Sequence, residues 1–252
     1  MKSISSVFFG AFVAAAIAGC GSGGGQREFA DADVDAGGGS GAVAKAIQVR
    51  IGTGNEWAKV VEPERYDNVP VFNETAYGVV VTDSVGNPVQ GVALKATVFG
   101  TRYRTGSWEL AGLSWRQRVD GECAGEDVNE NLVLDSGEDI SRDGQLTPGN
   151  VGTAYFGAEG EAKTMTTDNK GSALVRVRYP RDRNEWVEVK LRVTATVSGT
   201  ETSESRVFWL PVLPDDLGLG GITPTVPPPG QMIFNGSSYD SFSPYGTGAC
   251  PM

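Results

Sequence analysis

The sequence predicts an all-β fold, an antiparallel sandwich, and two observations support this prediction. Apolar and polar residues alternate in short runs, first where Ile47, Val49 and Ile51 alternate with Gln48 and Arg50, which is the period-two pattern of a half-buried strand. Turn sequences separate the runs, and no stretch shows sustained helical spacing with capping residues. About seven short strands with such turns are typical of a sandwich. The expected strands are 46–51, 77–82, 92–99, 107–118, 172–179, 186–197 and 205–212.

The first nineteen residues have the order of a secretory signal peptide. Lys2 precedes an apolar run over 7–17, which is too short for a transmembrane helix. The run ends in Ile17-Ala18-Gly19-Cys20, which resembles the lipobox of bacterial lipoproteins. The resemblance implies cleavage after residue 19, acylation of Cys20 and attachment to the cell envelope, to the outer membrane if the cell has two. An ordinary signal peptide followed by a chance cysteine is the alternative.

Glycine-rich segments flank the predicted sandwich, which we place at 46–213. Residues 20–45 contain two triplets of glycine and should form a flexible linker behind the lipid-bearing Cys20. Residues 214–252 are rich in Pro, Gly and Ser, so an extended tail is expected there. A long acidic insertion, 120–150, interrupts the sandwich.

Charge and composition exclude several classes of function. The formal net charge is −10, which disfavours a nucleic-acid partner, since that would require a basic face. The chain contains no histidine, which removes Ser-His and Cys-His nucleophile pairs and imidazole zinc sites. A glycan hydrolase would need two carboxylates flanking a cleft, and no such pair stands out beyond the acidic insertion. A non-catalytic role is therefore favoured.

Three cysteines are present, and one of them, Cys20, belongs to the expected lipid site. Cys123 and Cys250 remain and could form a disulfide in an oxidising compartment. Two free thiols that never meet are the alternative. A disulfide would fold the tail back along the domain.

Two segments carry a family resemblance. Residues 81–92, VTDSVGNPVQGV, resemble the leading hairpin of bacterial Ig-like domains of the invasin/intimin type, also called Big-1-like. Residues 166–177, TTDNKGSALVRV, resemble a later turn and strand of that family, and 186–197 its following strand. The resemblance implies an Ig-like antiparallel β-sandwich used in adhesion or presentation. A transthyretin-like or other surface sandwich remains the alternative.

Residues 127–138 within the insertion resemble the twelve-residue calcium loop of EF-hand proteins. Hard oxygen donors recur at alternate positions, as Ca²⁺ requires. Leu132 stands at the sixth position, where such loops carry glycine, so we expect strain and weakened affinity. The expected ligands are Asp127, Asn129, Asn131, the carbonyl of Val133, Asp135 and Glu138.

A second calcium-type run begins immediately after the first. It has Gly144 at the turn, but Asn150 stands where a bidentate glutamate is expected. The tandem arrangement resembles dockerin-like and thrombospondin-type repeats, since no helix is evident on either side. An acidic loop with accidental spacing is the alternative for both runs. The expected ligands of the second run are Asp139, Ser141, Asp143 and Gln145.

These patterns together indicate a surface-anchored, non-catalytic lipoprotein. It would carry an Ig-like adhesion or presentation module stabilised by calcium, with a membrane attachment through its lipid and a protein or glycan partner at the cell surface. The alternative is a structural subunit of an envelope or fibre assembly.

Overall fold

The computed structural model describes residues 46–54, 58–60, 65–66, 69–70, 72–157, 162–219, 231–234 and 239–251. The expected signal peptide, Cys20 and the whole linker, 20–45, lie outside these residues. Within the described part, no helix is long and apolar enough to cross a membrane.

The first sheet is antiparallel and has the strand order β1-β5-β10-β8, with β2 also paired to β5. Its long strands correspond to expected runs, although β5 begins five residues earlier than predicted. The bounds are β1 (Ile47–Ile51), β2 (Lys59–Val60), β5 (Phe72–Asp83), β8 (Thr153–Phe156) and β10 (Ser172–Pro180).

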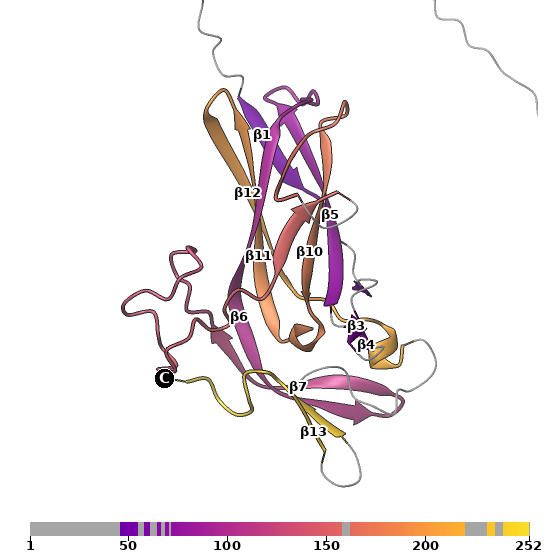
Figure 1. The fold of residues 1–252 in the computed structure, drawn as a ribbon. Helices are drawn as coiled ribbons and strands as arrows, with labels where there is room; N and C mark the ends of the chain where they lie inside the picture. The colour runs from indigo at the N-terminus through magenta and orange to yellow at the C-terminus, as the bar shows by residue number, and fades with distance from the viewer. Residues whose placement is uncertain are drawn as a thin grey trace, which may run out of the picture. The chain divides into compact units, whose positions relative to one another are not determined.

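The second sheet is also antiparallel, with the order β12-β11-β6-β14-β13, and β7 and β9 pair with β6. A separate small hairpin joins β3 (Arg65–Tyr66) to β4 (Val69–Pro70). The bounds are β6 (Ala93–Ala111), β7 (Ser114–Ala124), β9 (Thr164–Thr166), β11 (Val187–Val197), β12 (Thr200–Trp209), β13 (Gln231–Phe234) and β14 (Tyr239–Phe242). The two sheets form an Ig-like sandwich (Figure 1), which confirms the predicted fold class.

The core lies between the two sheets. Alternate residues of the central strands point inward, so Val79, Val177 and Leu191 have no exposed surface. Trp108 and Trp186 meet edge to face beneath them, with ring centroids 5.6 Å apart, a favourable geometry for two indoles. The period-two pattern of the sequence is therefore the pattern of burial.

The two turns that carry the family resemblance lie against each other. Asp83 Oδ1 accepts the backbone N–H of Asn87 at 2.9 Å, and Asp168 Oδ1 accepts that of Ser172 at 2.8 Å. The N–H of Val81 donates to the carbonyl of Gly171 at 2.8 Å. These short polar side chains organise their own turns, as the sequence predicts.

Strand boundaries differ from the prediction in two places. The expected strand 107–118 is a hairpin instead: β6 continues to Ala111, and β7 returns from Ser114. The last expected strand, 205–212, is displaced, because β12 already begins at Thr200. The register of β6 and β7 shifts next to Gly106, where a Cβ would lie 2.0 Å from the carbonyl oxygen of Arg118. Only glycine fits this bulge.

The described part of the tail contacts the sandwich. Strand β14 pairs with β6 through Phe242 and Ser107, and Ser243 Oγ donates to the carbonyl of Arg104. Two short 3₁₀ turns, η1 (Arg181–Arg183) and η2 (Asp215–Leu217), complete the described part of the chain.

Candidate metal centre

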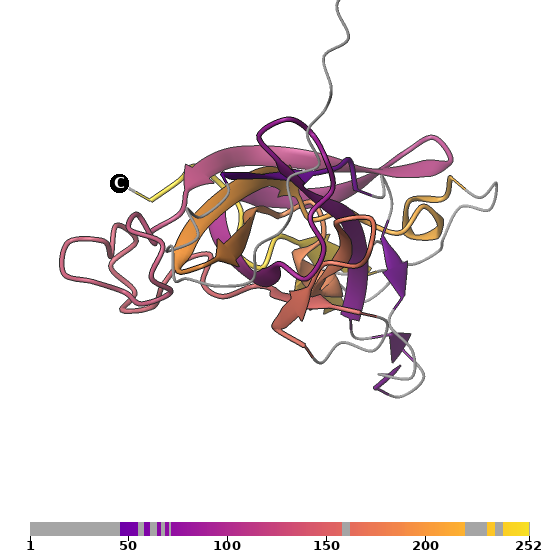
Figure 2. The same cartoon turned by 90° about the horizontal axis from the view of Figure 1, so that it is seen from above.

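The acidic insertion is a long loop between β7 and β8. In both views it projects from the side of the sandwich, near the end of the chain (Figure 1, Figure 2). Its first residue is held to the second sheet, because the N–H of Gly125 donates to the carbonyl of Thr101 at 2.7 Å. No helix flanks it: strands β7 and β8 lie on either side. The insertion is thus a calcium-type sequence on a β framework.

The first loop is organised by the side chain at its first position. Asp127 accepts the backbone N–H of Asn131 at 2.9 Å and that of Leu132 at 3.1 Å. Asn131 Oδ1 in turn accepts the N–H of Val133 at 2.7 Å. The chain therefore curls around the carboxylate of Asp127.

The second loop repeats this network twelve residues later. Asp139 accepts the N–H of Asp143 and that of Gly144, both at 3.1 Å. Asp143 Oδ1 accepts the N–H of Gln145 at 2.7 Å. Because the same three contacts recur at the same positions, the two runs are a structural repeat as well as a sequence repeat.

The backbone at the sixth position is left-handed in both loops, with φ of 65° at Leu132 and 73° at Gly144. The fourth positions, Glu130 and Arg142, both have φ of 60°. Leu132 therefore adopts the conformation that glycine adopts elsewhere, at a strain cost of about 1–2 kcal/mol. The expected strain is present, and the expected turn forms nevertheless.

Two glutamates close the loops. Glu138 closes the first loop, and Glu126, which stands just before the first loop, closes the second. Glu138 accepts the N–H of Asn129 at 3.4 Å and that of Asp135 at 3.0 Å, the third and ninth positions of the first loop. Glu126 accepts the N–H of Ser141 at 2.8 Å and that of Thr147 at 2.9 Å. These are the third and ninth positions of the second loop.

Glu126 was not among the residues expected from the sequence, because an EF-hand comparison looks for the closing glutamate at the twelfth position. That position is Asn150 in the second loop. The signal was nevertheless present: Glu126-Asp127 and Glu138-Asp139 are the same dipeptide, twelve residues apart. Glu126, which stands just before the first loop, therefore takes the place of the closing glutamate that the second loop lacks.

Three carboxylates converge in the second loop. Oxygens of Glu126, Asp139 and Asp143 all lie within 4.8 Å of one another. Glu126 is only 1% exposed, whereas Asp143 reaches solvent. This all-oxygen donor set could hold a metal ion. Ser141 lies beside it, with its Oγ 3.5 Å from Asp139, and the exposed Gln145 follows Asp143 along the chain.

The carboxylates of the first loop form no comparable group of three in the part of the insertion that the structure describes. The amides of Asn129 and Asn131 donate to Asp135 Oδ2, both at 2.7 Å. These hydrogen bonds lower the pKa of Asp135. Cation binding there would require the amide oxygens to replace the amide nitrogens. The second loop is thus better arranged than the first to hold a cation.

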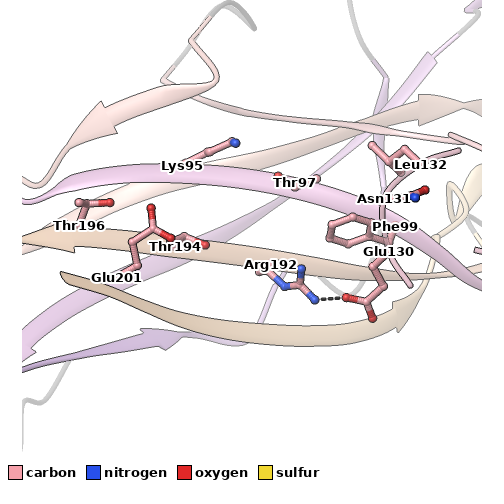
Figure 3. Close-up of a pocket in the computed structure, with 10 residues that line it drawn as sticks. All are labelled: Lys95, Thr97, Phe99, Glu130, Asn131, Leu132, Arg192, Thr194, Thr196 and Glu201. Atoms are coloured by element: carbon pink, nitrogen blue, oxygen red, sulfur yellow. Dashed lines mark hydrogen bonds and ion pairs between the residues drawn. The ribbon is translucent and has the colours of Figure 1, made fainter. Parts of the chain in front are cut away.

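The first loop is attached to the sandwich at its fourth position. The carboxylate of Glu130 forms ion pairs with Lys190 and Arg192 of β11, and Figure 3 shows the pair with Arg192. The guanidinium of Arg192 also lies 4.8 Å from the ring centroid of Phe99. In the second loop, the corresponding Arg142 is exposed.

The expected disulfide between Cys123 and Cys250 is present, with the two Cα atoms 5.4 Å apart. It fastens the tail to the base of the insertion, three residues before Glu126. Tyr245 extends this contact, because its hydroxyl donates to the carbonyl of Pro148 at 3.2 Å. The tail therefore supports both ends of the acidic loop.

The buried Tyr103 lies close enough to the acidic group for its pKa to respond to the charge of these carboxylates. Burial raises the pKa of its hydroxyl, and the negative charges of Glu126 and Asp143 raise it further. A cation bound between these carboxylates would oppose the second effect.

No protein-family model and no curated protein matches the chain. Among solved structures, the chain is similar to the GAE domain of GGA2p from Saccharomyces cerevisiae. The sequences are 10% identical, the TM-score is 0.18, and the match covers 61% of this chain and 96% of that one. A likeness at this level adds nothing to what the sheets themselves show.

Proposed function

We propose that the protein is a surface-anchored, non-catalytic lipoprotein whose Ig-like sandwich presents a calcium-binding double loop. The observation that carries the calcium assignment is the reciprocal closure of the loops by Glu126 and Glu138. Each glutamate binds the third and ninth backbone N–H groups of one loop. This fixes carboxylate oxygens beside the donors that the sequence places for a hard cation.

Calcium fits these residues better than zinc or copper would. The donors are carboxylate, amide, hydroxyl and carbonyl oxygens, and the chain has no histidine, whereas softer metals favour nitrogen and sulfur. Ten residues would supply the two sites together with Glu126: Asp127, Asn129, Asn131, Val133, Asp135, Glu138, Asp139, Ser141, Asp143 and Gln145. The bound ion would offset the mutual repulsion of the nine carboxylates over 120–143, which the single arginine of this segment only partly balances.

The anchoring part of the proposal depends on the lipobox-like sequence at Cys20 and on the family resemblance to invasin/intimin-type domains. The glycine-rich linker would let the sandwich stand away from the lipid. Presentation to a partner is favoured because the insertion projects to one side of the sandwich (Figure 2).

Calcium titration of the chain from residue 21 to 252, which retains every described residue, tests the metal assignment. We expect a rise in melting temperature with calcium, since a ligand that binds only the native state stabilises it by RT ln(1 + [L]/Kd). Asp139→Ala should abolish most of the rise. Glu109→Gln, which removes an exposed carboxylate on β6, is the matched control. An equal rise in both variants would refute the assignment.

A structural subunit of an envelope or fibre assembly is the second candidate. Strand β12 pairs only with β11 among the described strands, so its outer edge is open to a strand from a neighbour. Cross-linking in intact cells separates the two functions. A ladder of regular multimers would favour the assembly, and a single heterologous partner would favour presentation.

A further inference from the structure

A shallow groove begins on the outer face of the second sheet, beside the first loop (Figure 3), and continues past the edge of β6 to β8 of the first sheet. It consists of two adjoining hollows of about 360 Å³ and about 270 Å³, which share Lys95, Thr97 and Leu132. Leu132 belongs to the first loop, so the insertion forms one wall of the groove. Strands β6 and β11 contribute most of its floor.

Some of the basic side chains around this groove form ion pairs and others do not, among the described residues. Lys190 and Arg192 share the single negative charge of Glu130. Lys95 and Lys163 line the smaller hollow, and neither ammonium group forms an ion pair within the described part of the chain. Two lysines that pair with no described carboxylate favour an anionic ligand at this end.

Three threonine hydroxyls are among the other polar groups of the groove. Thr97 and Thr196 line the larger hollow, and Thr153 lines the smaller one. None of the three side chains makes a hydrogen bond to another described residue. Each hydroxyl can both donate and accept, which suits a ligand that is itself rich in hydroxyl groups. Glu201 at the far end can accept from such a ligand but would repel a second anion.

An extended peptide would find little to bind here. The floor is a sheet face, where Lys95 pairs with Thr194 and Thr97 with Arg192 in the β6–β11 ladder. The backbone groups that β6 and β11 turn toward each other are consumed by the ladder, so side chains meet the ligand on this floor. Strand addition, the usual way of holding a peptide on a sheet, needs a free edge.

We propose that this groove binds an acidic glycan, with a carboxylate or sulfate group of one sugar between Lys95 and Lys163. Hydroxyls of the neighbouring sugar would contact Thr97 and, further along, Thr196 and Glu201. An acidic glycan would be the partner in the proposed function. The groove rests on that function through Leu132, because calcium in the first loop would hold this side chain in place as the wall.

Calorimetry with an octasaccharide of hyaluronan as probe tests the proposal on the chain from residue 21 to 252, with and without calcium. We expect saturable binding that the Lys95→Gln Lys163→Gln double variant weakens by at least about tenfold. The matched control is Lys59→Gln Lys170→Gln, which removes two exposed charges elsewhere and therefore has the same net charge as the Lys95→Gln Lys163→Gln variant. It should bind like the parent chain.

Three comparisons decide between the outcomes. A heparin octasaccharide distinguishes sulfate from carboxylate as the preferred anion, and maltooctaose, which is neutral, should not bind. Equal binding of hexaglutamate would overturn the glycan assignment in favour of an acidic peptide. Equal weakening of hyaluronan binding by both double variants would overturn the groove as the binding site. So would the absence of hyaluronan binding by a chain that does bind calcium. If calcium does not bind, the lysine variants still test the groove without it, so failure of the metal site remains separate.

Discussion

The carboxylate of Glu126 accepts a hydrogen bond from the backbone N–H of Thr147 at 2.9 Å, across 21 residues of the most acidic segment in the chain. The other oxygen of Glu126 accepts the N–H of Ser141. A buried carboxylate in this position joins the start of the insertion to its end. It also brings negative charge to Asp139 and Asp143, which a cation would balance.

Glu126→Gln should lower calcium affinity at the second loop by at least about tenfold, because affinity in such loops depends on ligand charge. The side chain keeps its length and one acceptor, so one of its two backbone contacts, to Ser141 or to Thr147, is retained. Calorimetry of calcium binding measures the change. Glu138→Gln is the companion variant and should affect only the first loop. An unchanged titration for Glu126→Gln would exclude this residue as a ligand.

Gly144→Ala tests the left-handed turn of the second loop. An added Cβ would meet no atom within 4 Å, and φ is 73°, so the cost is conformational, about 1 kcal/mol. Because the proposed calcium ion would hold this turn, we expect the cost to appear as a several-fold weaker calcium affinity. Gly199→Ala is the matched control, with φ of 80° and equally open space. It should lower the melting temperature and leave the calcium affinity unchanged.

Removing the disulfide should destabilise the whole domain. The bridge spans 127 residues, and closing a loop of this length stabilises the folded state by roughly 4–5 kcal/mol in the chain-entropy model. Denaturant unfolding of the Cys123→Ser Cys250→Ser variant measures the loss. Its calcium affinity should fall too, because Cys123 anchors the strand that leads into Glu126. A variant with the parent's calcium affinity would show that the tail does not support the metal group.

Asp168→Asn tests the turn between β9 and β10 through its pH dependence. Hydrogen bonds from the backbone of Ser172 and Lys170 lower the pKa of Asp168 from its usual 3.8. A depressed folded-state pKa stabilises the fold above the unfolded pKa, and this stability is lost as pH falls through the folded value. The variant should therefore melt lower than the parent at about pH 7, and the difference should shrink toward about pH 2. A constant difference would contradict this.

The sequence predicted the sandwich well because burial in a two-layered sheet follows local alternation. Val177 and Leu191 have no exposed surface, and each stands between two basic residues in the sequence. The hairpin at Ala111 and Ser114 was missed because its turn, Gly112-Leu113, interrupts a run rich in strand-forming residues. The closing role of Glu126 was missed because it depends on a contact 21 residues away, which a motif read along the chain does not include.

Hydrogen exchange of the insertion tests the central claim most directly. The backbone N–H groups of Ser141 and Thr147 should exchange slowly with calcium and much faster with a chelator, while the core strand β11 should change little. In Glu126→Gln, these two N–H groups should lose most of their calcium-dependent protection, and that of Asp135 in the first loop should persist. Identical exchange with calcium and with chelator would contradict the account, and the insertion would then be an acidic loop without a metal.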